Sequence, residues 1–261
     1  MLKKRLIPKL QLSVKDSFRG KQSVLVVTRQ FGSRRAIGNP LSQAKIYESQ
    51  MADELILVNL EQTAESWSTM LKTVEELAEE LATPLSVGGG LKNIEQIQAL
   101  LDRGADKIVL NSGAINEPNL INRVAKTYGA QCVVVSIDVR QKNEDRWGVW
   151  AMNGKIDTKK NALDWACEAT DRGAGEVLVT AIDRDGTGQG LDLGITSCLT
   201  GALNVPVITS GGCGLAQHFV EGYQAGASAV AAGTFFCQRD QNPMQCRSHI
   251  RNAGLPIRLE V

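Results

Sequence analysis

The feature that most constrains the fold is an internal repeat with a spacing of 122 residues. Asn39 aligns with Asn161 and Gly90 with Gly212, without a gap over a long span. The pattern of glycine pair, helical segment, Gly-Ala and short apolar run occurs twice, as GGGLKNIEQIQALLDRGADKIVLNS and as GGCGLAQHFVEGYQAGASAVAAGT. A half of this kind would expose unpaired strand edges on its own, so the repeat predicts two halves that close on each other.

Short apolar runs rich in β-branched residues recur along the 261 residues. They are RLIPKLQL, ELILVNL, PLSVGGG, KIVLN, CVVVSIDV, EVLVTAID, PVITSGG and AVAAGT. Segments with helical periodicity, such as NIEQIQALLDRGA, separate most of them. Near-continuous apolar strands that alternate with amphipathic helices indicate a parallel sheet buried on both faces. Eight such units predict an α/β protein: a single (β/α)8 TIM barrel over residues 1–261, built from two (β/α)4 halves. The alternative, an open doubly wound sheet, is disfavoured because no GxGxxG follows the first strand.

Composition excludes several classes of function. The apolar fraction of 43% suits a large core, and the net charge of +1 provides no global field for nucleic acid or anionic membranes. The six cysteines form no CxxC pair and have no metal-like spacing with either histidine, which is typical of reduced core thiols in a cytoplasmic protein. We expect no metal and no organic cofactor. The apolar part of MLKKRLIPKL is too short for a signal peptide, and no run approaches a membrane span.

Two groups of glycine-rich loops follow predicted strands. In the first half they contain Gly89, Gly90, Asn111 and Ser112, and in the second half Ser210, Gly211, Gly212, Gly233 and Thr234. Glycines allow the backbone to approach an oxyanion, and helix N-termini offer free N–H groups to a phosphate. A single glycine pair usually marks a tight turn. Because this one is duplicated at symmetry-related positions, we predict two phosphate sites on opposite sides of the barrel mouth, for a phosphorylated small molecule.

Acidic residues also follow predicted strands. Asp138 ends the apolar run CVVVSID, and AIDRDGTGQG places Asp183, Asp185 and Thr187 on a glycine-rich loop after strand six. A lone aspartate is often a helix cap. At the carboxyl end of a barrel strand, however, it indicates a general acid or base or a ligand for a polar substrate.

The segment SFRGKQSVLVVTRQFGSRRAIG after strand one is interpreted as a long basic loop. Its cationic residues are Arg19, Lys21, Arg29, Arg34 and Arg35. Such a loop is commonly just solvated, but above a phosphate-lined mouth it is a candidate lid that holds an anionic ligand.

Several motifs together give a family resemblance that runs essentially end to end. They include K-R-L-I-P, G-N-P, D-E-L-I-L-V-N-L, V-G-G-G, G-A-D-K-I, V-V-V-S-I-D, I-D-R-D-G-T, S-G-G and I-R-L-E. The chain resembles the cyclase subunit of imidazole glycerol phosphate synthase, a barrel that receives ammonia from a separate class I glutaminase subunit. The resemblance implies that Gly90, Asn111, Ser112, Gly212 and Gly233 lie at phosphate sites. It also implies that Asp138 matches one of two catalytic aspartates, and it brings no cofactor.

The family's other catalytic aspartate belongs in strand one, where Gln11 stands. Asp16 is no substitute, because positions an odd number apart in a continuous strand face opposite sides. Sliding the alignment brings Ser13 into the slot, which is not a carboxylate either. Asn59 likewise replaces an aspartate that is usual at the end of strand two. Loss of one partner of an acid–base pair lowers the rate roughly a hundredfold or more, so we expect weak ring closure.

The opposite ends of the strands carry charges. Arg5, Glu54, Lys107 and Glu176 begin strands one, two, four and six. Charged residues commonly flank strands there for stability alone. The resemblance implies instead a charged ring at the entrance of an ammonia passage, with Ser86 further along the path and Asp106 at the glutaminase contact.

An intact entrance with an altered reaction centre is similar to a side branch of the family found with surface-polysaccharide genes. There the barrel works with a glutaminase and a separate ATP-dependent sugar amidotransferase. Three hypotheses follow: an ammonia-receiving barrel for sugar amidation in lipopolysaccharide synthesis, an authentic cyclase of histidine biosynthesis, and a non-catalytic phosphate-binding scaffold.

Overall fold

The computed structural model describes residues 3–18, 20–238 and 240–258. Eight strands form a closed parallel barrel, each at one of the eight apolar runs. They are β1 (Arg5–Ser17), β4 (Leu55–Asn59), β5 (Leu85–Gly88), β6 (Lys107–Leu110), β7 (Val133–Asn143), β10 (Glu176–Ala181), β11 (Val207–Ser210) and β12 (Ala229–Ala232). Neighbouring strands pair in the order β10-β11-β12-β1-β4-β5-β6-β7, and β7 pairs with β10 to close the sheet. The predicted (β/α)8 TIM barrel is confirmed.

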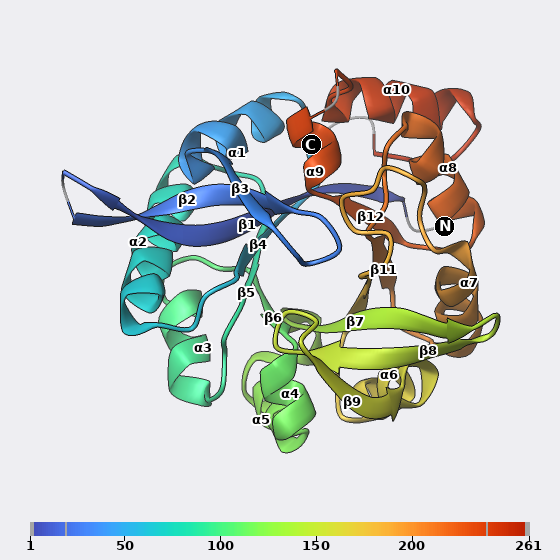
Figure 1. Cartoon of the computed structure of the whole chain (residues 1–261), viewed down its shortest axis with the longest axis horizontal. Helices are drawn as coiled ribbons and strands as arrows, with labels where there is room; N and C mark the ends of the chain where they lie inside the picture. The colour runs from blue at the N-terminus through green and yellow to red at the C-terminus, as the bar shows by residue number, and fades with distance from the viewer. Residues whose placement is uncertain (1–2, 19, 239, 259–261) are drawn as a thin grey trace.

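Helices cover the outside of the barrel (Figure 1). They are α1 (Pro40–Ser49), α2 (Ala64–Glu80), α3 (Ile94–Leu101), α5 (Asn119–Tyr128), α6 (Ala162–Asp171), α7 (Leu193–Ala202), α8 (Ala216–Gln224) and α10 (Pro243–Asn252), with the short α4 (Ser112–Asn116) and α9 (Thr234–Gln238) and a 3-10 turn, η1 (Ala130–Cys132). The repeat is visible in the caps. Asn39 accepts the Ser42 amide at the start of α1, and its counterpart Asn161 accepts the Leu163 amide at the start of α6.

The segment after strand one is not a loop, which corrects the sequence interpretation. β1 continues outward to Ser17 and pairs antiparallel with β2 (Gly20–Thr28), which pairs with β3 (Arg34–Gly38). In the second half, β7 continues into β8 (Arg146–Ala151) and β9 (Ile156–Asn161) in the same way. Figure 1 shows the two antiparallel extensions on opposite sides of the barrel. The run SVLVVT is β-branched and apolar, and its inner part is buried.

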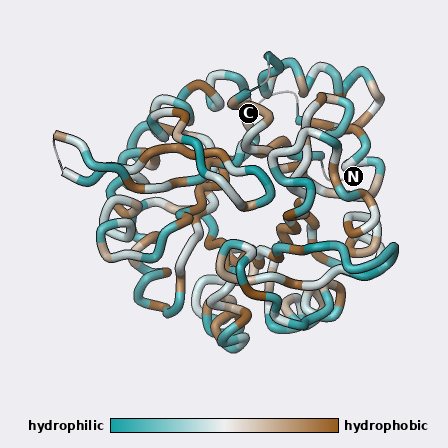
Figure 2. Tube along the Cα trace, in the orientation of Figure 1, coloured by the Kyte–Doolittle hydropathy of each residue, from teal (hydrophilic) through white to brown (hydrophobic). Residues whose placement is uncertain are grey.

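Alternation along the barrel strands divides the core in two. One cluster lies between the barrel and its helices and includes Leu6, Leu10 and Leu57. The other consists of Ile7, Ile56, Val109, Val134, Leu178, Ile208, Ala229 and Ala231. Because successive side chains on a strand point to opposite faces, this second cluster fills the barrel interior. Figure 2 shows hydrophobic residues concentrated on the barrel strands and hydrophilic ones at the end of the β7–β8 hairpin.

All six cysteines are free thiols, buried or half-buried. Burial raises the pKa of the Cys246 thiol to about 12. In the parts of the chain that the structure describes, no helix has the length and apolar character to span a bilayer.

Candidate active site

The glycine-rich loops at the carboxyl ends of the strands are built alike in the two halves. Gly89 and Gly211 are 122 residues apart and have φ angles of +107° and +94°, which L side chains rarely adopt. A Cβ on Gly89 would collide with the carbonyl oxygen of Asn59, and a Cβ on Gly211 would lie 2.6 Å from that of Ala181. Both glycines are therefore required by a close approach to the end of the neighbouring strand.

The two groups of loops line two cavities at the mouth. Gly89, Gly90, Asn111 and Ser112 line the larger cavity. Ser210, Gly211, Gly212, Gly233 and Thr234 line the smaller one. The structure thus brings together each group of predicted phosphate-site residues, and their binding of phosphate stays a prediction. Lys9 and Gln11 line both cavities, so strand β1 forms the partition between them.

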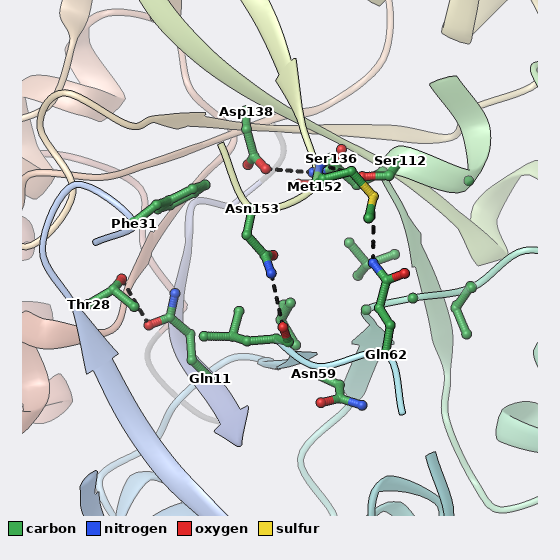
Figure 3. Close-up of a pocket in the computed structure, with 18 of the residues that line it drawn as sticks. Gln11, Thr28, Phe31, Asn59, Gln62, Ser112, Ser136, Asp138, Met152 and Asn153 are labelled. Atoms are coloured by element: carbon green, nitrogen blue, oxygen red, sulfur yellow. Dashed lines mark hydrogen bonds between the residues drawn. The ribbon is translucent and has the colours of Figure 1, made fainter. Parts of the chain in front are cut away.

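Two hairpin turns extend over the larger cavity. Gln30 and Phe31 in the β2–β3 turn have φ angles of +52° and +59°. Met152 and Asn153, in the β8–β9 turn of the second half, have φ angles of +53° and +56°. Non-glycine residues are uncommon in this region and mark sites held by their surroundings. Phe31, Met152 and Asn153 line the cavity, as Figure 3 shows.

Each turn is held by the opposite half of the barrel. The Gln30 amide donates to the Asp185 carbonyl at 2.8 Å. Asn153 Nδ2 donates to the Leu60 carbonyl at 2.9 Å, and the Met152 amide donates to Ser112 Oγ at 2.9 Å. The two antiparallel extensions therefore cross-link the halves above the mouth.

Asp138 is buried at the end of the parallel part of β7, with 7% of its surface exposed. Asn111 Nδ2 donates to its Oδ2 at 2.7 Å. Burial raises the pKa of this carboxyl to about 6, although the charge of Lys9 and the Asn111 hydrogen bond oppose the shift. A carboxyl that titrates near neutrality in a cavity suits proton transfer. Figure 3 shows Gln11 across the cavity from Asp138.

The three residues predicted to bind substrate in the loop after β10 have different contacts. Asp185 lines the smaller cavity and accepts a hydrogen bond from Thr28 Oγ1 at 2.7 Å. Asp183 pairs with Arg140 at 2.9 Å, and Thr187 Oγ1 donates to the Arg184 carbonyl at 2.7 Å. The geometry therefore favours Asp185 as the residue of this loop that meets a ligand, while the contacts of the other two shape the loop.

Gln11 is held by the same threonine as Asp185. Thr28 Oγ1 lies 3.4 Å from Gln11 Oε1, and burial raises the pKa of the Asp185 carboxyl. Asp185 lines the smaller cavity and Asp138 the larger one, and the negative charge of Asp185 adds to the burial that raises the pKa of Asp138. Gln11 occupies the position opposite Asp138 as a neutral amide.

Lys9 is a site residue that the sequence interpretation missed. Its Nζ lies 3.4 Å from Oγ1 of Thr180, which is fully buried. A signal was present, because Arg5, Ile7, Lys9 and Gln11 alternate along β1 and must share the inner face of the barrel. Following this alternation along the strand would have been enough to predict a cation at the mouth.

Asp16, Ser13 and Asn59, the other residues of the first half considered in connection with the missing carboxylates, have hydrogen-bond or ion-pair partners of their own. Asp16 lies on the exposed hairpin and pairs with Lys21 at 2.9 Å, so it cannot replace Gln11. The Ser13 hydroxyl donates to the Glu61 carboxylate. Asn59 is buried at the larger cavity, where its Oδ1 accepts the Glu61 amide at 3.1 Å. Asn59 therefore also serves as a cap of the loop after β4.

The basic residues predicted for the strand-one loop do not form one lid. Arg34 lines the larger cavity and pairs with Glu61 at 3.5 Å. Lys21 lies far along the hairpin, and Arg29 and Arg35 are exposed. Arg19 lies outside the described residues. Of this set, Arg34 is the cation that the structure places at the cavity.

At the opposite end of the barrel, four charged side chains form a closed ring. Glu54 Oε2 lies 2.7 Å from Arg5 and 3.0 Å from Lys107, while Glu176 lies 3.0 Å from Arg5 and 3.1 Å from Lys107. Burial alone would lower the pKa of the Arg5 guanidinium, but the carboxylates of Glu176 and Glu54 outweigh it and raise that pKa. Each charge is thus compensated by two opposite charges, which offsets part of the cost of burying it.

Two further residues lie near the ring. Ser86 Oγ donates to Glu54 Oε1 at 2.6 Å and is buried. Asp106 is exposed, and its carboxylate accepts the Leu85 amide at 2.7 Å. Asp106 therefore fixes the start of β5 while remaining accessible. Among the described residues, no group of three or more His, Cys, Asp or Glu side chains has the arrangement of a metal site.

The fold and the site together define a (β/α)8 barrel with two glycine-lined cavities at the carboxyl ends of its strands and a charged ring at the opposite end. Residues 6–242 match the family described as "Histidine biosynthesis protein". The chain is 64% identical over the full length of both proteins to one from Prochlorococcus marinus (strain MIT 9313) that is provisionally named imidazole glycerol phosphate synthase subunit hisF2.

Two further relatives share the name imidazole glycerol phosphate synthase subunit HisF. The protein from Gluconacetobacter diazotrophicus is 39% identical over 99% of this chain and 97% of its own length. The protein from Clostridium botulinum (strain Okra / Type B1) is 38% identical over 99% of this chain and all of its own. The chain belongs to the HisF family, the cyclase subunits of imidazole glycerol phosphate synthase.

Proposed function

We propose that this chain is a divergent HisF barrel that receives ammonia from a class I glutaminase and delivers it to the amidation of a sugar in surface-polysaccharide synthesis. In this role it works with a separate sugar amidotransferase, and its own ring-closing activity is weakened. The observation that carries the proposal is the contrast between the two ends of the barrel. The charged ring at the base is complete, whereas the mouth has Gln11 opposite Asp138.

The base supports an entrance for a small neutral molecule. The ring residues neutralise each other in pairs, and Ser86 continues a polar lining toward the interior. Behind them lies the apolar cluster around Ile7 and Ile56, which disfavours ions more than uncharged ammonia. The exposed carboxylate of Asp106 next to this end offers a contact for the glutaminase.

The residues at the mouth support the proposal that ring closure is weakened. Ring closure divides acid and base duties between two carboxyl groups, and an amide at Gln11 performs neither near neutral pH. Asp138 keeps its burial and its pKa of about 6, so the site retains one proton carrier. In the larger cavity Asp138 then lacks the carboxyl partner that cyclisation needs, which supports a barrel that passes its ammonia on rather than one that closes a ring.

The test is the rate of glutamine hydrolysis by the partner glutaminase with and without this chain. We expect association of the purified pair and a stimulated rate. Glu54→Ala with Lys107→Ala should reduce ammonia delivery to the acceptor reaction, while Lys45→Ala with Glu80→Ala, which removes an exposed ion pair, serves as the matched control. Absence of both association and stimulation would reject the proposal.

The second candidate is a cyclase of histidine biosynthesis, favoured by the full-length identity of 38–39% to proteins named HisF. Growth of a histidine auxotroph that lacks its cyclase, when supplied with this chain, would support it. We expect no growth, because Gln11 cannot supply the second proton-transfer group.

A further inference from the structure

Lys9 has a central place in the mouth that the proposed function does not use. Its side chain lines the larger and the smaller cavity, which contain the two groups of glycine-rich loops. It stands two residues beyond Ile7, so it follows directly on the apolar layer that fills the barrel interior. Lys9 therefore lies where the barrel interior opens into both cavities.

Lys9 lies near a buried and a half-buried carboxyl group and a buried hydroxyl. Its charge acts on the carboxyls of both Asp138 and Asp185, and lowers the pKa of each against the effect of burial. Thr180 Oγ1 accepts one of its hydrogen bonds. An ammonium group has three donors, so Lys9 has further donors to offer a ligand in either cavity.

We propose that Lys9 forms an oxyanion subsite between the two phosphate loops, which binds the oxygen of the substrate's reacting carbonyl group. The substrate class is a phosphorylated compound with an aldehyde or ketone carbonyl group near the phosphate. Lys9 is then a catalytic residue that lies on the inner face of β1 beside Gln11.

The reaction at this subsite is the addition of ammonia to the carbonyl group, and it needs no oxidant, reductant or other reagent. Ammonia that passes through the barrel, a step that rests on the proposed function, adds at the mouth to the carbonyl carbon of the bound phosphorylated compound, and the π electrons of the C=O bond move to the oxygen. The Lys9 ammonium stabilises the charge that develops on this oxygen, as preorganised donors do in oxyanion holes. The new nitrogen loses a proton to the Asp138 carboxylate, which is ionised at neutral pH.

A binding experiment on the chain alone tests the subsite independently of any glutaminase. The probes are 2-phosphoglycolate and ethyl phosphate, which share a phosphate monoester but differ in a carboxylate. Calorimetric titration of the wild-type chain should show 2-phosphoglycolate binding roughly tenfold or more tightly, the effect of one hydrogen-bonded charge. Lys9→Met should abolish this preference and leave ethyl phosphate binding nearly unchanged, and Lys9→Arg should retain most of it.

The matched control is Lys15→Met, on the same strand and the same side of the alternation but in the exposed hairpin. It should bind both probes as the wild type does, and thermal unfolding should show that each variant is folded. An unchanged preference in Lys9→Met would overturn the subsite, as would a wild-type chain that shows no preference. Lys92 also lines the larger cavity. Loss of the preference in Lys92→Met instead would place the oxyanion beside Lys92 and also reject Lys9. Failure of glutaminase stimulation would affect the proposed function and leave this result standing.

Discussion

Gln11 and Asp138 occupy equivalent positions in the two halves of the barrel. Gln11 lies in register with Val58 of β4, and Asp138 lies in register with Thr180 of β10. Val58 and Thr180 are themselves 122 residues apart, which is the spacing of the repeat. The same point of the two half-barrels therefore carries an amide on one side of the mouth and a carboxyl on the other.

This relationship predicts the effect of Gln11→Asp. The change restores a carboxylate opposite Asp138, so we expect formation of imidazole glycerol phosphate to rise by roughly a hundredfold over the wild-type chain. Ser13→Asp is the control, because it adds a carboxylate to the same strand beside Glu61 rather than in the mouth. A Gln11→Asp chain no faster than the control would mean that the pocket has lost more than one proton-transfer group.

Asp138→Asn should stabilise the folded protein while removing the proton-transfer group of the larger cavity. Because the folded-state pKa of about 6 lies above the ordinary value of 3.8, folding is favoured by protonation. The wild-type chain has this stability in full below about pH 4 and loses it as the pH rises through about 6. At pH 7 the ionised carboxyl costs about 3 kcal/mol, of which Asn recovers a large part because it still accepts the Asn111 hydrogen bond. Urea unfolding of both chains at pH 4 and pH 7 measures the difference, which should vanish at the lower pH.

Glu54→Gln should destabilise the barrel from its base. Glu54 is 3% exposed and compensates Arg5 and Lys107 at once. Removal of this charge leaves Arg5 and Lys107 to share the single carboxylate of Glu176, at a cost of about 3 kcal/mol in the free energy of unfolding. Glu80→Gln, in an exposed pair with Lys45, should change it by less than about 1 kcal/mol. Equal effects of the two changes would contradict the idea of a buried network.

Gly89→Ala and Gly211→Ala should have similar, large effects because their sites are related by the repeat. Each adds a Cβ that meets the carbonyl of a neighbouring strand end at a positive φ. We expect a loss of several kcal/mol in stability and of phosphate binding in the corresponding cavity. Gly201→Ala, within helix α7 and with open space around its Cβ, should instead stabilise by about 0.5–1 kcal/mol. Thermal unfolding in the presence and absence of inorganic phosphate separates the two effects.

Much of the molecule was predictable from local pattern. The eight apolar runs correspond to the eight barrel strands, and the spacing of 122 residues recurs in β5 and β11, in β6 and β12, and in the caps Asn39 and Asn161. The antiparallel extensions were not recognised, because a β-branched run inside a basic segment has the same pattern whether it pairs or not. Their pairing depends on β1 and β7 continuing beyond the barrel.

The amino-acid sequence by itself determined the closed barrel and the residues at the strand ends, since alternation and repetition are local properties of the chain. It also determined that Gln11 replaces an acid. Only the tertiary structure decided which residues meet: that Lys9 borders both cavities, that Asp185 and not Asp183 lines one of them, and that Arg5, Glu54, Lys107 and Glu176 close a ring. The reason is physical, because contacts between strands far apart in the chain depend on register and closure, and pair energies follow from distance and burial that no local pattern contains.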